Sequence, residues 1–368
     1  MRSLLASLLF LLLVPLVAEW YQRASVGNAP AQASLSVPEL LGGEAGKGFA
    51  YPAPGRTFRF PEDHGPHPDF RSEWWYFTGN LEDFGYELTI FRQATRSPAD
   101  ALIPRTSEWA APGLMMGDFA VTDVAGQHFY RYEKLSRAAL GLAGSQPGRR
   151  LAWVENWSVE LTGPGQFRVR AAQEDCSLDL NLSSLKSPVL QGDKGYSRKG
   201  DDPQQSSYYY SLTRLKSQGS INGRQVQGLS WMDREWSTRS LSSKLAGWDW
   251  FSLQLEDGGE LMFYQLRQKA GGSSPWSAGS WVDGAGQVRH LSNQDVKIEV
   301  LGEWSSPLDG TRYPAGWKLQ VLPLGRELTL KPRLADQELR GAVRYWEGAV
   351  EVAEGGRGYV ELVGYDQK

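Results

Sequence analysis

The sequence predicts an all-β fold, a barrel or a sandwich, and three observations indicate this class. The chain of 368 residues contains 15 Trp, 15 Tyr and 41 Gly. Aromatic side chains suit pleated sheets, whereas Gly marks turns and bulges. Strand-like segments recur roughly every ten residues with Gly or Asp turns between them. No convincing amphipathic helix longer than about ten residues occurs beside them.

The predicted strands begin at residue 74, and regular structure is expected from about Phe58 onward. They cover 74–81, 86–93, 114–123, 151–161, 167–172, 207–215, 228–236, 248–255, 260–267, 279–282, 296–301, 317–321, 327–331 and 358–365. Gly163-Pro164-Gly165 predicts a hairpin turn, and Asp257-Gly258 is a strong two-residue turn signal. The best helix-like stretches, 132–142 and 335–339, are short.

The length favours two domains. An apolar run over residues 4–18 follows Met1-Arg2. It is short for a membrane span and suits the core of a signal peptide, although an uncleaved anchor is the alternative. We therefore expect export to the periplasm. The expected organisation is a signal peptide or anchor at 1–18, a flexible stalk at 19–56, one domain at 57–225 and a second at 226–368.

Composition excludes several functions. The net charge of −3 gives no basic face for nucleic acid. The single cysteine, Cys176, allows no internal disulfide and is expected to be a small buried residue. The four histidines lack metal-binding spacing, and no nucleophile elbow or phosphate-binding Gly-rich loop is present. We therefore expect neither a metal nor a cofactor.

Two Trp-rich segments carry the candidate site residues. Residues 73–77 read Glu-Trp-Trp-Tyr-Phe, and residues 231–236 read Trp-Met-Asp-Arg-Glu-Trp. Strand alternation separates Trp74 and Tyr76 from Glu73, Trp75 and Phe77. In the second segment it separates Trp231, Asp233 and Glu235 from Met232, Arg234 and Trp236. The sequence does not determine which of the two sets lines a cavity. An equally good interpretation is that both segments only pack the core.

Carboxylates among so many rings are candidate general acids, because desolvation raises the pKa of a carboxyl group. The candidate catalytic residues are Asp233, Glu235 and Glu73. The candidate ligand-binding residues are Trp74, Trp75, Tyr76, Trp231, Arg234, Trp236, Trp248, Asp249, Trp250 and Tyr264. Together they predict an aromatic cavity for an apolar or polyene-like ligand.

Residues 67–81, together with 186–192, 208–211, 231–236 and 247–251, resemble the family that contains hydroxyneurosporene synthase, also called carotenoid 1,2-hydratase. They match its exported, AttH-like branch in order, over about residues 50–365. The resemblance implies two lipocalin-like (calycin-type) antiparallel β-barrels packed together. It also implies that an acid and aromatic rings could protonate an isoprenoid double bond before water attacks.

The resemblance implies histidines on both sides of Asp233, where this chain has Met232 and Arg234. An arginine does not shuttle protons at neutral pH. This departure favours binding of a hydrophobic ligand, a lipid or an isoprenoid, over carotenoid hydration. The alternatives are a non-catalytic lipid carrier beside a membrane or an ABC-type transporter, and a cycloaddition or isomerisation catalyst for a polyene.

Overall fold

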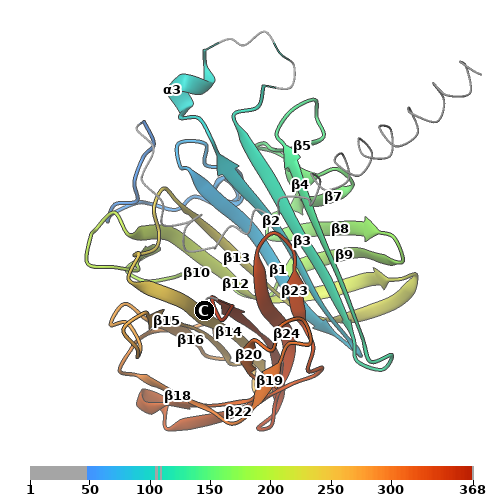
Figure 1. Cartoon of the computed structure of the whole chain (residues 1–368), viewed down its shortest axis with the longest axis vertical. Helices are drawn as coiled ribbons and strands as arrows, with labels where there is room; N and C mark the ends of the chain where they lie inside the picture. The colour runs from blue at the N-terminus through green and yellow to red at the C-terminus, as the bar shows by residue number, and fades with distance from the viewer. Residues whose placement is uncertain (1–47, 104–106, 108–109, 367–368) are drawn as a thin grey trace, which may run out of the picture. The chain divides into compact units, whose positions relative to one another are not determined.

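The computed structural model describes residues 48–103, 107 and 110–366, which belong to one compact unit and form two antiparallel sheets (Figure 1). The predicted signal segment 1–18 and most of the predicted stalk lie outside these residues. Within them, no helix combines the length and apolar character needed to cross a membrane.

The first sheet contains thirteen of the described strands. Its path runs β4-β3-β2-β1-β13-β12-β9-β8-β7-β6-β5, and β10 and β11 pair with β12. The edge strands β4 and β5 lie close together, so the sheet curls into a nearly closed barrel. The bounds are β1 (Ser72–Leu81), β2 (Phe84–Ala94), β3 (Gly113–Asp123), β4 (His128–Arg137), β5 (Ala143–Ser145), β6 (Arg150–Val154), β7 (Trp157–Gly163), β8 (Gln166–Gln173), β9 (Cys176–Ser184), β10 (Val189–Leu190), β11 (Tyr196–Arg198), β12 (Ser206–Ile221) and β13 (Arg224–Ser237).

The second sheet forms the other nearly closed barrel. Its path runs β17-β16-β15-β14-β25-β24-β22-β21-β18, with β23 on β24. A short turn, residues 293–295, joins the edge strands β17 and β18. The bounds are β14 (Leu245–Leu255), β15 (Glu260–Gln268), β16 (Ala278–Val282), β17 (Val288–Ser292), β18 (Val296–Val300), β21 (Trp317–Val321), β22 (Arg326–Pro332), β23 (Glu338–Arg340), β24 (Arg344–Val352) and β25 (Gly356–Val363), while β19 (Glu303–Ser305) and β20 (Arg312–Pro314) form a separate pair.

The described helices are short. They are η1 (Glu62–His64), α3 (Pro98–Ala101) and η2 (Leu322–Leu324). The two stretches that look most helix-like in the sequence are strand or loop in the structure. Residues 132–137 lie in β4, an edge strand whose faces are both partly exposed, so that its polar residues hide the two-residue period. Residues 338–339 lie in β23.

The division between the sheets falls between Ser237 and Leu245, later than the boundary at 225/226 that the sequence analysis expects. The reason is that β13 pairs with both β1 and β12 of the first sheet. Residues 48–56, at the end of the predicted stalk, are also bound to the folded part. The backbone of Ala53 exchanges hydrogen bonds of 3.0 and 2.9 Å with the Tyr208 hydroxyl.

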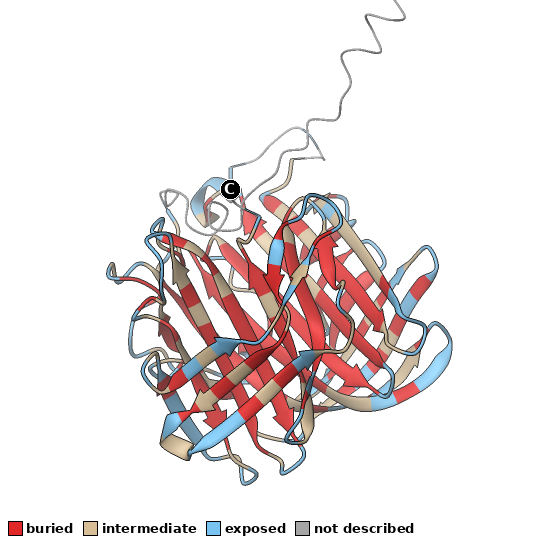
Figure 2. Ribbon diagram, turned by 60° about the horizontal axis from the view of Figure 1, so that its bottom comes forward, coloured by how far each residue is buried: buried red, intermediate tan, exposed pale blue. Residues whose placement is uncertain are grey.

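Each barrel has its own core, and the strands are buried along most of their length (Figure 2). Trp75, Phe77, Met232 and Trp236 fill the first barrel, and Cys176 is buried there as a free thiol. A third cluster of buried apolar residues lies between the two sheets and includes Tyr76, Trp231 and Trp250.

The sheets touch closely at one end of this contact. The Asn80 amide donates to the Gly358 carbonyl at 3.0 Å, and the Thr122 hydroxyl donates to Gln337 at 2.7 Å. A Cβ on Gly85 would come within 2.6 Å of the Ala349 Cβ, closer than non-bonded carbons approach. Glycine at this position therefore allows the two sheets to meet.

Candidate functional site

Beyond this contact, the first sheet presents two neighbouring rows of side chains to the second sheet. One row consists of Asp118, Thr89, Tyr76, Asp233 and Ser211, on β3, β2, β1, β13 and β12 in turn. The next consists of Met116, Phe91, Trp74, Glu235 and Tyr209 on the same strands. Strand alternation brings both rows to one face of the sheet.

The second sheet presents two rows of side chains to the first sheet. One consists of Tyr264, Trp250, Glu361 and Glu347, on β15, β14, β25 and β24 in turn. The next consists of Leu266, Trp248, Val363 and Tyr345. A cavity of about 150 Å³ lies between the facing rows, and every row member except Ser211 lines it. The candidate site is therefore a property of both sheets together.

Asp233 is the cavity carboxyl group whose surroundings best suit a general acid. Its Oδ1 accepts hydrogen bonds from the Ser211 hydroxyl at 2.5 Å and from the Trp231 indole at 2.8 Å. Its Oδ2 accepts from the Tyr209 hydroxyl at 2.7 Å, and that hydroxyl accepts from the Trp250 indole at 3.2 Å. Burial raises the pKa of Asp233 to about 7, although these hydrogen bonds oppose the rise.

Glu235 has a different environment, because Lys199 forms an ion pair with it. The Lys199 ammonium also lies 5.5 Å from the ring centre of Tyr209 and 5.2 Å from that of Tyr264. Glu235 therefore differs from Asp233, which accepts hydrogen bonds from neutral donors alone. Of the two, Asp233 is the better candidate for a proton donor.

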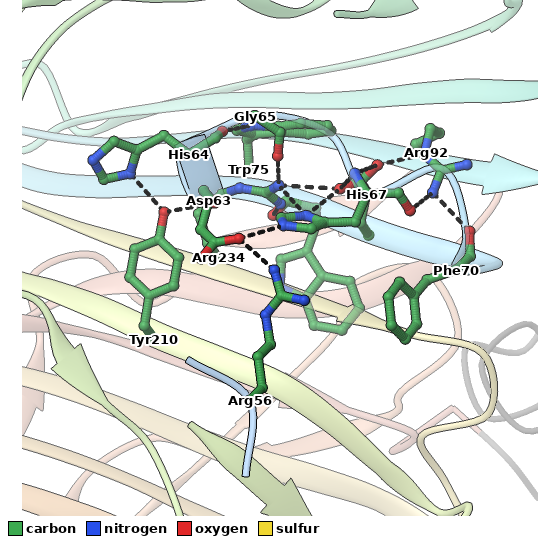
Figure 3. A network of polar contacts seen from close by, with 12 residues as sticks. Arg56, Asp63, His64, Gly65, His67, Phe70, Trp75, Arg92, Tyr210 and Arg234 are labelled. Carbon is green, nitrogen blue, oxygen red and sulfur yellow. Dashed lines mark hydrogen bonds and ion pairs between the residues drawn. The ribbon is translucent and has the colours of Figure 1, made fainter. Parts of the chain in front are cut away.

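Glu73, the third candidate acid, does not reach the cavity. It lies near the start of β1, where Arg92 binds it at 2.5 Å and Arg234 at 3.0 Å. Figure 3 shows both arginines in the polar network around His67. The backbone N–H of His67 also donates to Glu73, at 3.0 Å. Burial works against ionisation, but both arginines and His67 outweigh it and hold the Glu73 pKa well below its usual range. The expected raised pKa of Glu73 is therefore wrong.

Arg234 is a structural residue of this network. Its guanidinium donates to the carbonyls of Trp74 at 2.5 Å and Gly65 at 2.6 Å, and lies 3.9 Å from the ring centre of Trp75 (Figure 3). The network continues through His67 and Asp63 to Arg56, and it fastens the segment before β1 to β1, β2 and β13.

The sequence-predicted ligand residues thus divide between two faces. Those that line the cavity are Trp74, Tyr76, Trp248, Trp250 and Tyr264. Trp231 supports Asp233 from the same face. Trp75, Arg234 and Trp236 face the interior of the first barrel instead. Asp249 lies on the opposite face of β14, where it binds Arg267 at 3.0 Å and the Tyr365 hydroxyl at 2.9 Å.

Sequence reasoning missed several carboxyl groups near the cavity, namely Glu87, Asp118, Glu347 and Glu361. Each is a single charged residue within an otherwise apolar strand segment, which was the available signal. It also missed Lys199 and Tyr209. Among the described residues, no three His, Cys, Asp or Glu side chains are arranged to hold a metal ion.

Comparison with known proteins gives the family. The model of the AttH-like family matches residues 51–365. The chain belongs to the AttH-like family. No curated protein matches it in sequence. A crystal structure of a Nitrosomonas europaea protein assigned as AttH is 33% identical, with a TM-score of 0.76, over 86% of this chain and 100% of that one.

Two more distant structures share the fold of this AttH-like chain. Kievitone hydratase from Nectria haematococca is 15% identical with a TM-score of 0.62, over 83% of this chain and 92% of that one. CghA is 14% identical with a TM-score of 0.51, over 87% and 97%. The predicted pair of lipocalin-like antiparallel barrels is confirmed.

Proposed function

We propose that this AttH-like protein binds a hydrophobic molecule between its two sheets and adds water to a carbon–carbon double bond, with Asp233 as the general acid. The observation that carries the proposal is a carboxyl group whose pKa lies near 7, set in an aromatic cavity. Such a group is protonated often enough to donate at neutral pH, and it is acidic enough to do so.

The cavity walls suit the intermediate of this reaction. Protonation of an alkene leaves a carbocation, which the faces of Trp74, Trp248 and Trp250 could stabilise. A cavity of about 150 Å³ holds a group of roughly the size of one aromatic ring. The ligand is therefore a small molecule, or a longer lipid or isoprenoid that inserts its end.

The residues beside Asp233 do not weigh against this chemistry. Met232 and Arg234 occupy the positions where the carotenoid hydratases are expected to carry histidine. Both side chains point away from the cavity, since they alternate with Asp233 along β13. Proton supply instead falls to Asp233 and the Tyr209 hydroxyl that contacts it. That a protein of the same fold is named kievitone hydratase is consistent with a water-adding reaction.

The test is an Asp233→Asn variant, assayed with whatever ligand copurifies with the protein from its own cells, as identified by native mass spectrometry. The amide keeps the size of the side chain but cannot donate the acid proton. We expect binding to persist and uptake of ¹⁸O from labelled water to disappear. Asp83→Asn, at an exposed carboxylate, is the matched control. A parent protein that binds its ligand without converting it would refute the catalytic part and leave a carrier.

A further inference from the structure

A group of carboxyl side chains lies beside the cavity, apart from Asp233 and Glu235. Glu347 and Glu361 stand directly opposite each other on β24 and β25. Asp118 lies on the facing sheet and accepts a hydrogen bond of 3.3 Å from the Tyr345 hydroxyl. Glu87 projects from the same face of β2 as the cavity residue Thr89. Like charges opposite one another destabilise a sheet, so this arrangement needs an explanation.

These carboxyl groups have no counter-charge of their own. Among the described residues, no Lys, Arg or His forms an ion pair with any of the four, whereas Glu235 has Lys199 and Glu73 has two arginines. Burial, with repulsion from Glu133 and Glu361, raises the pKa of Asp118 to about 8. Burial, with repulsion from Glu87 and Glu361, raises the pKa of Glu347 well above its usual value. Lys199, the partner of Glu235, opposes the rise of the Glu361 pKa, which reaches about 7. The fold therefore favours the neutral form of these carboxyl groups.

Glu87, which is buried beside the three carboxyl groups that line the cavity, also lacks a partner. Its side chain is 1% exposed, and neither of its carboxyl oxygens has a hydrogen-bond partner. The hydroxyl of Thr89, two residues along the same strand face, lies near enough to oppose the rise of the Glu87 pKa but outside hydrogen-bond distance. Unpaired polar atoms in a protein interior are costly and rare. Glu347 and Asp118, by contrast, each accept one tyrosine hydroxyl.

We propose that the ligand of this cavity carries a protonated primary amine, held by Glu347, Asp118 and Glu361, with its apolar body against Trp248 and Trp250. An ammonium group supplies the positive charge that the cluster lacks and N–H donors for its oxygens. The aromatic rings suit both the apolar body and the cation. This inference rests on the proposed function, because it names the ligand class of the same cavity.

The charge balance predicts how binding depends on pH. An incoming ammonium lowers the pKa of the carboxyl groups around it, so they release protons as the amine binds. The amine must therefore bind more tightly at pH 8 than at pH 6, while it is still protonated itself. The titratable groups that face Glu347 from the neighbouring strands are Tyr76 of β1, Glu87 of β2, Asp118 of β3, Tyr345 of β24, and Tyr359 and Glu361 of β25. Glu133 of β4 faces Asp118, and Asp233, Glu235 and Lys199 face Glu361.

Calorimetric titration of the full chain with benzylamine and with benzyl alcohol tests the proposal, because the two probes differ little except in charge. We expect benzylamine to bind at least about tenfold more tightly, a difference of roughly 1.4 kcal/mol. Titration in two buffers with different ionisation enthalpies should show proton release. Glu347→Gln should remove most of the preference for the amine and leave alcohol binding within about twofold.

Glu351→Gln is the matched control, since Glu351 lies on the same strand but is exposed. Equal affinity for the two probes, or amine binding without proton release, would overturn the inference and leave the apolar cavity of the proposed function intact. Failure of both probes to bind would count against both proposals. If Glu347→Gln does not fold, proton release by the parent protein decides the matter.

Discussion

At the scale of single residues, two neighbouring carboxyl groups on β13 differ because their partners differ. Burial raises the pKa of Asp233 to about 7, although its neutral hydrogen-bond donors oppose the rise. Glu235 is two residues away on the same face and has the ammonium of Lys199. Side chains of Lys199 and Glu235 are 10% and 5% exposed, so each charge depends on the other. Removing one partner of a buried ion pair destabilises a protein far more than replacing both partners with uncharged residues.

Lys199→Met should therefore lower the free energy of unfolding by about 3–5 kcal/mol, because it leaves Glu235 buried and unpaired. The double variant Lys199→Met/Glu235→Gln should recover most of this loss. Urea denaturation measures both. Lys318→Met, which breaks a solvent-exposed pair with Glu327, should leave the free energy of unfolding nearly unchanged, because water screens such pairs. A double variant as unstable as the single one would contradict the argument.

At the scale of elements, β1 and β13 each have one face in the first barrel and the other on the cavity. The sequence predicts this division correctly, since it follows from the two-residue period of a strand. It does not predict which face lines the cavity, because that depends on where the second sheet docks. The partners of these strands on that sheet are more than a hundred residues away in sequence, as in the hydrogen bond from Tyr76 to Glu347.

The adjacent residues Trp74 and Trp75 test this division. Trp75 is fully buried, and its indole donates to the His64 carbonyl at 2.9 Å. Trp75→Ala should cost about 3–5 kcal/mol of stability. Trp74 is half-buried at the cavity wall, so Trp74→Ala should cost less stability but weaken ligand binding. Chemical denaturation and ligand titration of both variants give the answer, and the opposite pattern would exclude our assignment of the faces.

Gly85 tests the close contact between β2 and β24. In Gly85→Ala the new methyl would lie 2.6 Å from the Ala349 Cβ and 2.7 Å from the Tyr359 hydroxyl. The sheets must shift apart, which should cost about 1–3 kcal/mol. Ala349→Gly added to this variant should recover part of the loss, since it removes one of the two clashes. Thermal unfolding of both variants checks this, and an unchanged melting temperature in Gly85→Ala would argue against the tight contact.

At the scale of the whole molecule, buried carboxyl groups determine how stability depends on pH. The folded-state pKa values of Asp118 and Asp233 are raised to about 8 and about 7, above the usual 3.8 of Asp. At a pH between 3.8 and the raised value of each group, the folded state binds more protons than the unfolded state. Stability therefore falls as pH rises through this range. Asp63 changes stability with pH in the opposite direction, because its pKa is lowered to about 2 in the folded state. Its contribution is lost as pH falls from about 4 to about 2.

The free energy of unfolding should therefore be largest near pH 4 and decrease by several kcal/mol toward pH 8, at about 1.4 kcal/mol for each pKa unit. Urea denaturation across this range measures it. Asp118→Asn should flatten the alkaline side of the profile, because the amide has no proton to lose. A stability that rises from pH 5 to pH 8 would show that these carboxyl groups are ionised without penalty.

The sequence predicts the all-β class and most of the central strands, because their apolar runs and Gly turns are local signals. It also predicts Asp233 and five of the cavity aromatics. It missed Lys199, which lies in a loop and acts through Glu235, a contact that only the folded chain creates. It misassigned Glu73, because its arginines come from β2 and β13. The pKa of a buried carboxyl group depends on charged partners that are distant in sequence. A local sequence pattern does not predict those partners.

The two walls of the cavity belong to different sheets, and this has a thermodynamic consequence. A molecule bound there contacts both walls, so its binding energy also opposes separation of the barrels. Because an unfolded chain has no such cavity, a ligand present at 100 times its Kd adds about 2.7 kcal/mol to the stability. The melting temperature can therefore serve as a sensor, and a library of unsaturated amines can be ranked by heating the protein with each member.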